Sequence, residues 1–184
     1  MNQQLLVLTI SSVAAVMLLA GSMQDASAAG YLKIGDIKGE STDDGHKDWI
    51  NLLSVSQSID RPSSSEKSKR SHSSATFGDI VLVKEVDAST PKLQEAIAKG
   101  TYFPEVQIDF TSDTSEDRRI PYLQWELKNA RITSYSFSGS AGDVVPVDQI
   151  SLNFEEIKVT YTKIDPRTGE ASTIEYSWKV EKGE

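Results

Sequence analysis

The sequence predicts a mainly β protein, a small antiparallel β-barrel of two sheets with one short flanking α-helix. Three observations lead to this fold class. Apolar and polar residues alternate over many short runs, which is typical of strands with one buried face. A single ten-residue stretch has helical spacing. The alternation also changes phase at Asn129-Ala130 and Glu155-Glu156. Because side chains alternate strictly along a strand, such a change indicates a bulge or a barrel corner.

Residues 1–28 are predicted to be a signal peptide. Leu5 to Ala20 is almost wholly apolar, but it is too short to span a bilayer comfortably. The small-residue triplet Ala26-Ser27-Ala28 follows, so cleavage is expected between Ala28 and Ala29. The segment before Leu5 has no Lys or Arg, and an uncleaved membrane anchor is therefore the alternative. Cleavage would leave residues 29–184 as one secreted, periplasmic or cell-surface domain, no longer held at the membrane.

The composition argues against nucleic acid as a partner and against disulfides as a source of stability. The chain has 184 residues and a net charge of −8, and removal of residues 1–28 takes away only Asp25, which leaves −7. An acidic domain does not attract phosphate, which requires clustered Lys and Arg. The sequence contains no cysteine, so core packing and subunit contacts must stabilise the domain.

Strands are predicted along most of residues 29–184, with a polar loop over 40–48. The final hairpin turns at Asp165 to Gly169, where a glycine suits the left-handed position after a type I turn. The predicted strands are residues 31–34, 49–56, 77–86, 103–110, 122–127, 150–154, 157–161 and 174–180.

The predicted helix follows Ser89-Thr90, which can cap it, and has Pro91 in its first turn. Gly100 is expected to end it. A helix of this length is marginal alone, so it must dock on the sheets. The apolar stripe available for docking consists of Leu93, Ala96 and Ile97.

A serine-rich segment, Pro62 to Ser74, interrupts the strands. It has seven serines in thirteen residues, and little in it can offset the entropy of ordering through burial. It is therefore predicted to be a projecting loop. Basic residues on an acidic protein suit contact with a neighbouring copy, and a solvated tip without a partner is the alternative. The candidate contact residues are Ser63, Ser64, Ser65, Glu66, Lys67, Lys69 and Arg70.

No pattern in the sequence indicates catalysis, a metal or a cofactor. The two histidines, His46 and His72, are not spaced as metal ligands. The turn Asp43 to His46 lacks the spaced oxygens of a calcium loop and is expected to be a solvated turn. No serine lies in a G-x-S-x-G nucleophile elbow. The chain is therefore predicted not to be an enzyme, and a hydrolase in an unfamiliar barrel is the alternative.

Several segments, in order along the chain, resemble the Hcp (haemolysin-coregulated protein) family. A first strand leads into a G-x-x-G-E-S turn, and a Gly-His pair and an aromatic–aliphatic strand follow. The family motif residues are Gly39, Glu40, Ser41, Gly45 and His46. Further similar segments are 89–93 with Gly100, 127–132, 138–140 with 146–154, and Tyr161 with Gly169. The resemblance covers essentially all of residues 29–184.

This resemblance implies a barrel that assembles, without catalysis, into hexameric rings. In type VI secretion such rings stack into a tube that a contractile sheath propels, and the lumen carries effectors. The 62–74 loop corresponds to the extended loop that reaches toward the next ring. The signal peptide is a departure, because tube proteins assemble in the cytoplasm. The alternative function is an exported binding module or effector carrier that uses the same barrel without forming tubes.

Overall fold

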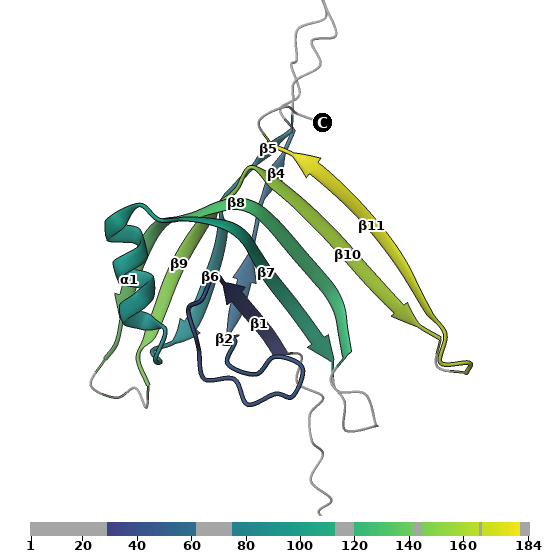
Figure 1. Ribbon diagram of the computed structural model, residues 1–184, viewed down its shortest axis with the longest axis horizontal. Helices are drawn as coiled ribbons and strands as arrows, with labels where there is room; N and C mark the ends of the chain where they lie inside the picture. Colours follow the sequence, from purple (N-terminus) through teal and green to yellow (C-terminus); the bar gives the residue numbers. More distant parts are fainter. Residues whose placement is uncertain are drawn as a thin grey trace, which may run out of the picture.

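The computed structural model describes residues 29–61, 75–112, 120–140, 142, 145–165 and 167–180. Strands and one helix make up this part of the chain (Figure 1). The elements are β1 (Ala29–Ile34), β2 (Ile50–Leu52), β3 (Ser54–Ser56), β4 (Ile59–Asp60), β5 (Thr76–Phe77), β6 (Ile80–Glu85), α1 (Thr90–Lys99), β7 (Tyr102–Ser112), β8 (Ile120–Ser138), β9 (Val147–Asn153), β10 (Glu156–Ile164) and β11 (Ala171–Lys179).

One strongly curled antiparallel sheet forms the body of the protein. Its strand order is β2-β1-β7-β8-β9-β6-β3, and β10 pairs with both β8 and β11. The two ends of this order, β2 and β3, are consecutive pieces of one chain segment, and the Leu53 N–H between them donates to the Val83 carbonyl at 2.8 Å. The mainly β fold with one flanking helix is thus confirmed, although no continuous ladder of pairs among the described strands closes the barrel.

Both predicted phase changes are confirmed as corners of the sheet. β8 pairs with β10 through Lys128 and with β9 from Arg131 onward, and Asn129 between them has a positive φ of 48°. Opposite this bend, the Glu155 N–H donates to the Lys128 carbonyl at 3.1 Å. The Asn129 side-chain amide donates to the Glu155 carboxylate at 2.6 Å. The corner therefore joins the barrel wall to the β10–β11 hairpin.

Helix α1 lies where the sequence places it and packs on the sheet through Leu93 and Ala96. Gly100 ends it with φ 63°, and its N–H donates to the Ile97 carbonyl at 3.1 Å. Ser89 of the predicted pair Ser89-Thr90 is the N-cap residue, but its side chain makes no capping hydrogen bond. Its hydroxyl donates instead to the Asp87 carboxylate at 2.5 Å, which orders the turn before the helix.

Apolar side chains from both ends of the strand order meet inside the curled sheet. The side chains of this core are almost completely buried. They come from β1, β2, β6, β7, β8, β9, β10 and α1. The fully buried aliphatic residues are Leu32, Ile34, Ile50, Ile80, Leu82, Leu93, Val106, Ile108, Leu127, Ile150, Leu152 and Ile157.

A buried polar cluster fixes α1 to the sheet. Lys84 on β6 and Asp148 on β9 are cross-strand partners, and the Lys84 ammonium lies 3.1 Å from the Asp148 carboxylate and 2.8 Å from that of Asp87. The hydroxyls of Thr90 and Tyr135 donate to the same Asp148 carboxylate. Since an unpaired buried charge is costly, this cluster holds the start of α1 to β6 and β9.

Removal of a core leucine tests this packing. Leu127→Ala is expected to lower the free energy of unfolding by about 2–5 kcal/mol, because Leu127 is fully buried and its loss leaves a cavity. Leu53→Ala is the matched control, since Leu53 is 59% exposed and its truncation should change stability by at most about 0.5 kcal/mol. Urea unfolding measures both values. Equal effects would contradict the assignment of the core.

The buried cluster also predicts a loss of stability in acid. Burial raises the pKa of Asp148, but hydrogen bonds from Thr90, Tyr135 and Lys84 and the charge of Lys84 outweigh it and lower the pKa below its usual value. A lowered folded-state pKa gives stability that is present above the ordinary Asp pKa of about 3.9 and is lost as the pH falls below it. In Asp148→Asn, the slope of unfolding free energy against acidic pH should be smaller than in the unmodified chain. Parallel slopes in urea titrations would argue against this role.

Candidate functional site: the motif loop and the hairpin strip

The motif loop, residues 39–49, folds tightly against the barrel wall. Its two arms pair through the Gly39 N–H and the Asp48 carbonyl at 2.9 Å, and through the Ser41 N–H and the Trp49 carbonyl at 3.0 Å. A Cβ on Gly39 would lie 2.4 Å from the Trp49 carbonyl oxygen, so only glycine fits there. Asp48 turns the chain back with φ 63°.

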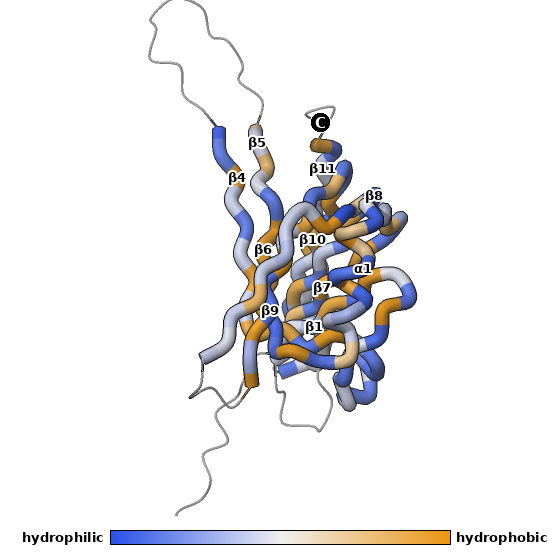
Figure 2. The backbone as a smooth tube through the Cα atoms, turned by 90° about the vertical axis from the view of Figure 1, so that its left-hand side faces the viewer, coloured by the Kyte–Doolittle hydropathy of each residue, from blue (hydrophilic) through white to orange (hydrophobic). Residues whose placement is uncertain are grey.

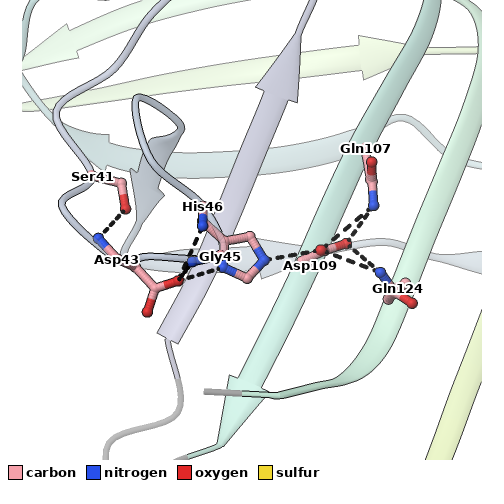
Figure 3. Close-up of polar contacts among 7 residues, drawn as sticks. All are labelled: Ser41, Asp43, Gly45, His46, Gln107, Asp109 and Gln124. Carbon is pink, nitrogen blue, oxygen red and sulfur yellow. Dashed lines mark hydrogen bonds and ion pairs between the residues drawn. The ribbon is translucent and has the colours of Figure 1, made fainter. Parts of the chain in front are cut away.

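His46 pins this loop to the wall (Figure 3). Its side chain is 3% exposed, with Nδ1 2.8 Å from Oδ1 of Asp43 and Nε2 3.0 Å from Oδ2 of Asp109. The imidazole stacks on Tyr31 with ring centroids 4.3 Å apart, and Trp49 meets it edge-on at 4.8 Å. Aromatic packing against Tyr31 and Trp49 and a carboxylate at each nitrogen therefore fix the position of the ring.

The two carboxylates that face His46 also receive other donors. Oδ1 of Asp43 accepts the backbone N–H groups of Gly45 and His46 at 3.0 and 3.1 Å. Asp109 is 3% exposed and accepts the side-chain amides of Gln107 and Gln124, each at 3.2 Å. Because these buried carboxylate oxygens all receive hydrogen-bond donors, they stabilise one arrangement of the loop.

The expected solvated turn at Asp43 to His46 is correct for Asp44 and Gly45, which are exposed, but wrong for His46, which is buried against β1 and β7. Asp109, Gln107 and Gln124 were not among the residues predicted from the sequence. A signal was present: Gln107, Asp109 and Thr111 alternate with apolar residues on β7, which predicts a polar face. Only the tertiary structure shows that the motif loop covers that face.

The other motif residues have local structural roles. The Glu40 carboxylate accepts the Ala88 N–H at 3.1 Å, which links the motif loop to the turn before α1. The Ser41 side chain is buried and its Oγ accepts the Asp43 N–H at 3.3 Å. The structure thus brings all five motif residues into one loop that is held by ordinary hydrogen bonds.

A narrow ribbon, β4 paired with β5, projects from the body beside the hairpin (Figure 2). Phe77 anchors it by stacking on Trp178 of β11 at 5.9 Å and by meeting Phe154 edge-on at 6.5 Å. The candidate contact residues Ser63, Ser64, Ser65, Glu66, Lys67, Lys69 and Arg70 lie outside the described residues. The ribbon leads into the segment that contains them.

The outer half of the β10–β11 hairpin carries exposed apolar side chains. Tyr161 is 45% exposed, Ile174 73% and Tyr176 44%. The cross-strand partners Val159↔Tyr176 and Tyr161↔Ile174 lie on one face of the hairpin. We call these four residues the hairpin strip.

The candidate site consists of a motif loop that His46 attaches to the barrel wall and of an exposed apolar strip on the hairpin. In the described ranges, no group of three His, Cys, Asp or Glu side chains could hold a metal ion. The helical residues described here also include no segment that could cross a membrane.

Comparison with known proteins identifies the family. Residues 31–161 match the family described as type VI secretion system effector, Hcp. Protein hcp1 of Pseudomonas aeruginosa is 28% identical over 153 residues, which cover 82% of this chain and 93% of that protein. The chain belongs to the Hcp family of type VI secretion.

Solved structures have the same fold. One is described as a type six secretion system protein; its TM-score is 0.77 at 23% identity, and the similarity covers 86% of this chain and 99% of that one. Hcp1 from Salmonella typhimurium gives a TM-score of 0.69 at 22% identity, with 85% and 97% covered. These similarities agree with the curled sheet and flanking helix described above.

Replacement of His46 tests the pinning of the motif loop. His46→Ala is expected to destabilise the fold by about 3–5 kcal/mol, because two carboxylates lose a buried partner. Lys38→Ala is the control: it removes an exposed ion pair to Asp48 in the same loop and should leave the unfolding midpoint nearly unchanged. Chemical denaturation followed by tryptophan fluorescence measures the stability of both variants. A negligible effect of His46→Ala would show that His46 does not hold the motif loop to the barrel wall.

Proposed function

We propose that this chain is a non-enzymatic structural protein that assembles into hexameric rings, and that the rings stack into a tube able to carry small effectors in its lumen. The observation that carries the proposal is the Hcp family match over residues 31–161. The fold supports it, because the polar groups of the motif loop bind one another and are not arranged for chemistry.

The free edge of β11 supports lateral assembly. β11 has nine residues and, among the described strands, pairs with β10 alone. Long exposed edges are usually covered in native proteins because they invite pairing with other chains. A ring provides such cover, since head-to-tail contacts between identical copies close on themselves.

The serine-rich segment is proposed to make the contact between stacked rings. The β4–β5 ribbon directs the chain away from the body just before and after residues 62–74 (Figure 2). Lys67, Lys69 and Arg70 would meet an acidic protein, with −7 on the mature chain. Attraction of this kind weakens as salt screens it.

Export is the second part of the proposal. Residues 1–28 are proposed to act as a signal peptide, so that the mature domain 29–184 assembles outside the cytoplasmic membrane, in the periplasm or at the cell surface. Assembly through strand edges and apolar surfaces does not depend on the compartment. A tube in this location would not need to follow the sheath-driven route.

Electron microscopy of purified residues 29–184 tests assembly. The expected result is annular particles and tubes, with a native mass of six chains for the single ring. A monodisperse monomer at every concentration would refute the proposal, and rings that never stack would favour an exported binding module. Deletion of Ser63 to Ser74 should leave the unfolding transition intact and shift tubes toward single rings, because no described core residue is lost.

The proposed export is tested by the mass of the protein recovered from its own cells. Cleavage should give a chain that begins at Ala29, in the periplasmic or extracellular fraction. An intact N-terminus in the membrane fraction would indicate a retained anchor. Ala28→Arg is expected to block cleavage, because signal peptidase requires a small residue there.

A further inference from the structure

We propose that the hairpin strip, Val159, Tyr161, Ile174 and Tyr176, is the surface on which the next copy of the chain packs, in a head-to-tail contact. This inference rests on the proposed ring and specifies the part of the protomer that forms it. The strip is an extension of the hydrophobic core that the described residues of one chain leave exposed.

The strand register shows this extension. Ile157 and Trp178 are cross-strand partners at the base of the hairpin, and Ile157 is fully buried. The next partners on the same face are Val159↔Tyr176 and then Tyr161↔Ile174. Exposure rises along this line, to 73% at Ile174. The apolar face therefore continues beyond the point where the chain's own core ends.

The neighbouring strands extend the same face. Leu123 and Trp125 of β8 lie beside Tyr161 and Val159, and Phe110 of β7 meets Trp125 at 5.6 Å between ring centroids. All three are only partly buried. The strip is thus the outer part of a broad apolar face on β7, β8, β10 and β11, which lie side by side in this order (Figure 1).

The opposite face of the hairpin is polar from its base to the pair Thr162↔Thr173, and an apolar pair, Ile164↔Ala171, follows next to the turn. Lys158 on this face pairs with Glu175 at 3.1 Å, and the other side chains before the turn pair are Thr, Ser, Glu and Lys. Strict alternation of this kind is typical of a strand with one face covered and one face in water. Because no described part of the chain covers the apolar face, its sequence indicates a covering partner.

Charge favours a second copy as that partner. The mature chain carries −7, whereas Glu156 to Lys179 contains four acidic and four basic residues and is neutral. Two copies that approach through most other surfaces would meet like charge. The hairpin is a surface on which an acidic neighbour packs without that repulsion, and it lies beside the free edge of β11.

The contact must be head-to-tail because a hexameric ring cannot be built from one self-complementary patch alone. β11 and α1 lie at opposite ends of the molecule (Figure 1). Each copy would therefore present its strip to a different surface of its neighbour, at or toward the end that carries α1.

The proposed contact is tested by placing the same negative charge on the apolar face or on the polar face of β11. Ile174→Asp should raise the concentration needed for half-assembly at least about tenfold, since it places a carboxylate in the apolar contact. Thr173→Asp adds the same charge to the adjacent, exposed residue on the polar face and should stay within about twofold of the unmodified chain. Sedimentation measures both, and circular dichroism confirms that each variant is folded. Tyr161→Ser serves as a second strip variant.

If Ile174→Asp and Tyr161→Ser assemble like the unmodified chain, the strip is not the contact, although the proposed ring survives. If the unmodified chain never assembles, the proposed function and this inference fail together. Mixing tests the orientation: tagged Ile174→Asp should co-purify with unmodified chains and shorten their assemblies, because its second contact surface is intact. No co-purification would indicate a self-complementary contact and overturn the head-to-tail arrangement.

Discussion

The bend of β8 at Asn129 is the constraint on which the rest of the fold depends. β8 has nineteen residues, and the bend directs the two halves of one of its edges to two different strands. Before the bend β8 holds β10, and after it β9. Glu155 fills the opposite corner with a backbone and a side-chain hydrogen bond. The barrel wall and the projecting hairpin therefore belong to one continuous sheet, and the position of the hairpin is set by the core.

Two buried polar clusters each attach a connecting segment to this sheet. Lys84 and Asp148 hold the start of α1 to β6 and β9, while His46 holds the motif loop to β7 through Asp109. Both place charged or ionisable groups where water does not reach, and both supply each group with several partners. Such clusters stabilise one arrangement because every alternative leaves a buried polar group unpaired. Without disulfides, they fix the connections that apolar packing alone would leave adjustable.

Strand alternation, the glycine at the helix end and the phase changes at Asn129 and Glu155 were predictable from the sequence, because each depends only on residues that are close together along the chain. The pairing of distant strands was not, since alternation does not say which strand lies beside which. For the same reason the motif loop was recognised by its residues, whereas its attachment was missed: the partner of His46, Asp109, is sixty-three positions away. The side-chain cap expected at Ser89 does not form, because its backbone is helical (φ −76°, ψ −24°) and not extended as in a typical N-cap, and its hydroxyl points to Asp87.

The stack of Phe77 on Trp178 joins the base of the β4–β5 ribbon to the last strand of the hairpin. If the ribbon contacts the ring above and the hairpin contacts the copy alongside, then one aromatic pair lies between the axial and the lateral directions of the assembly. Tension along the tube would reach the circumference through this joint. Resistance to stretching and resistance to splitting would then be coupled through this contact.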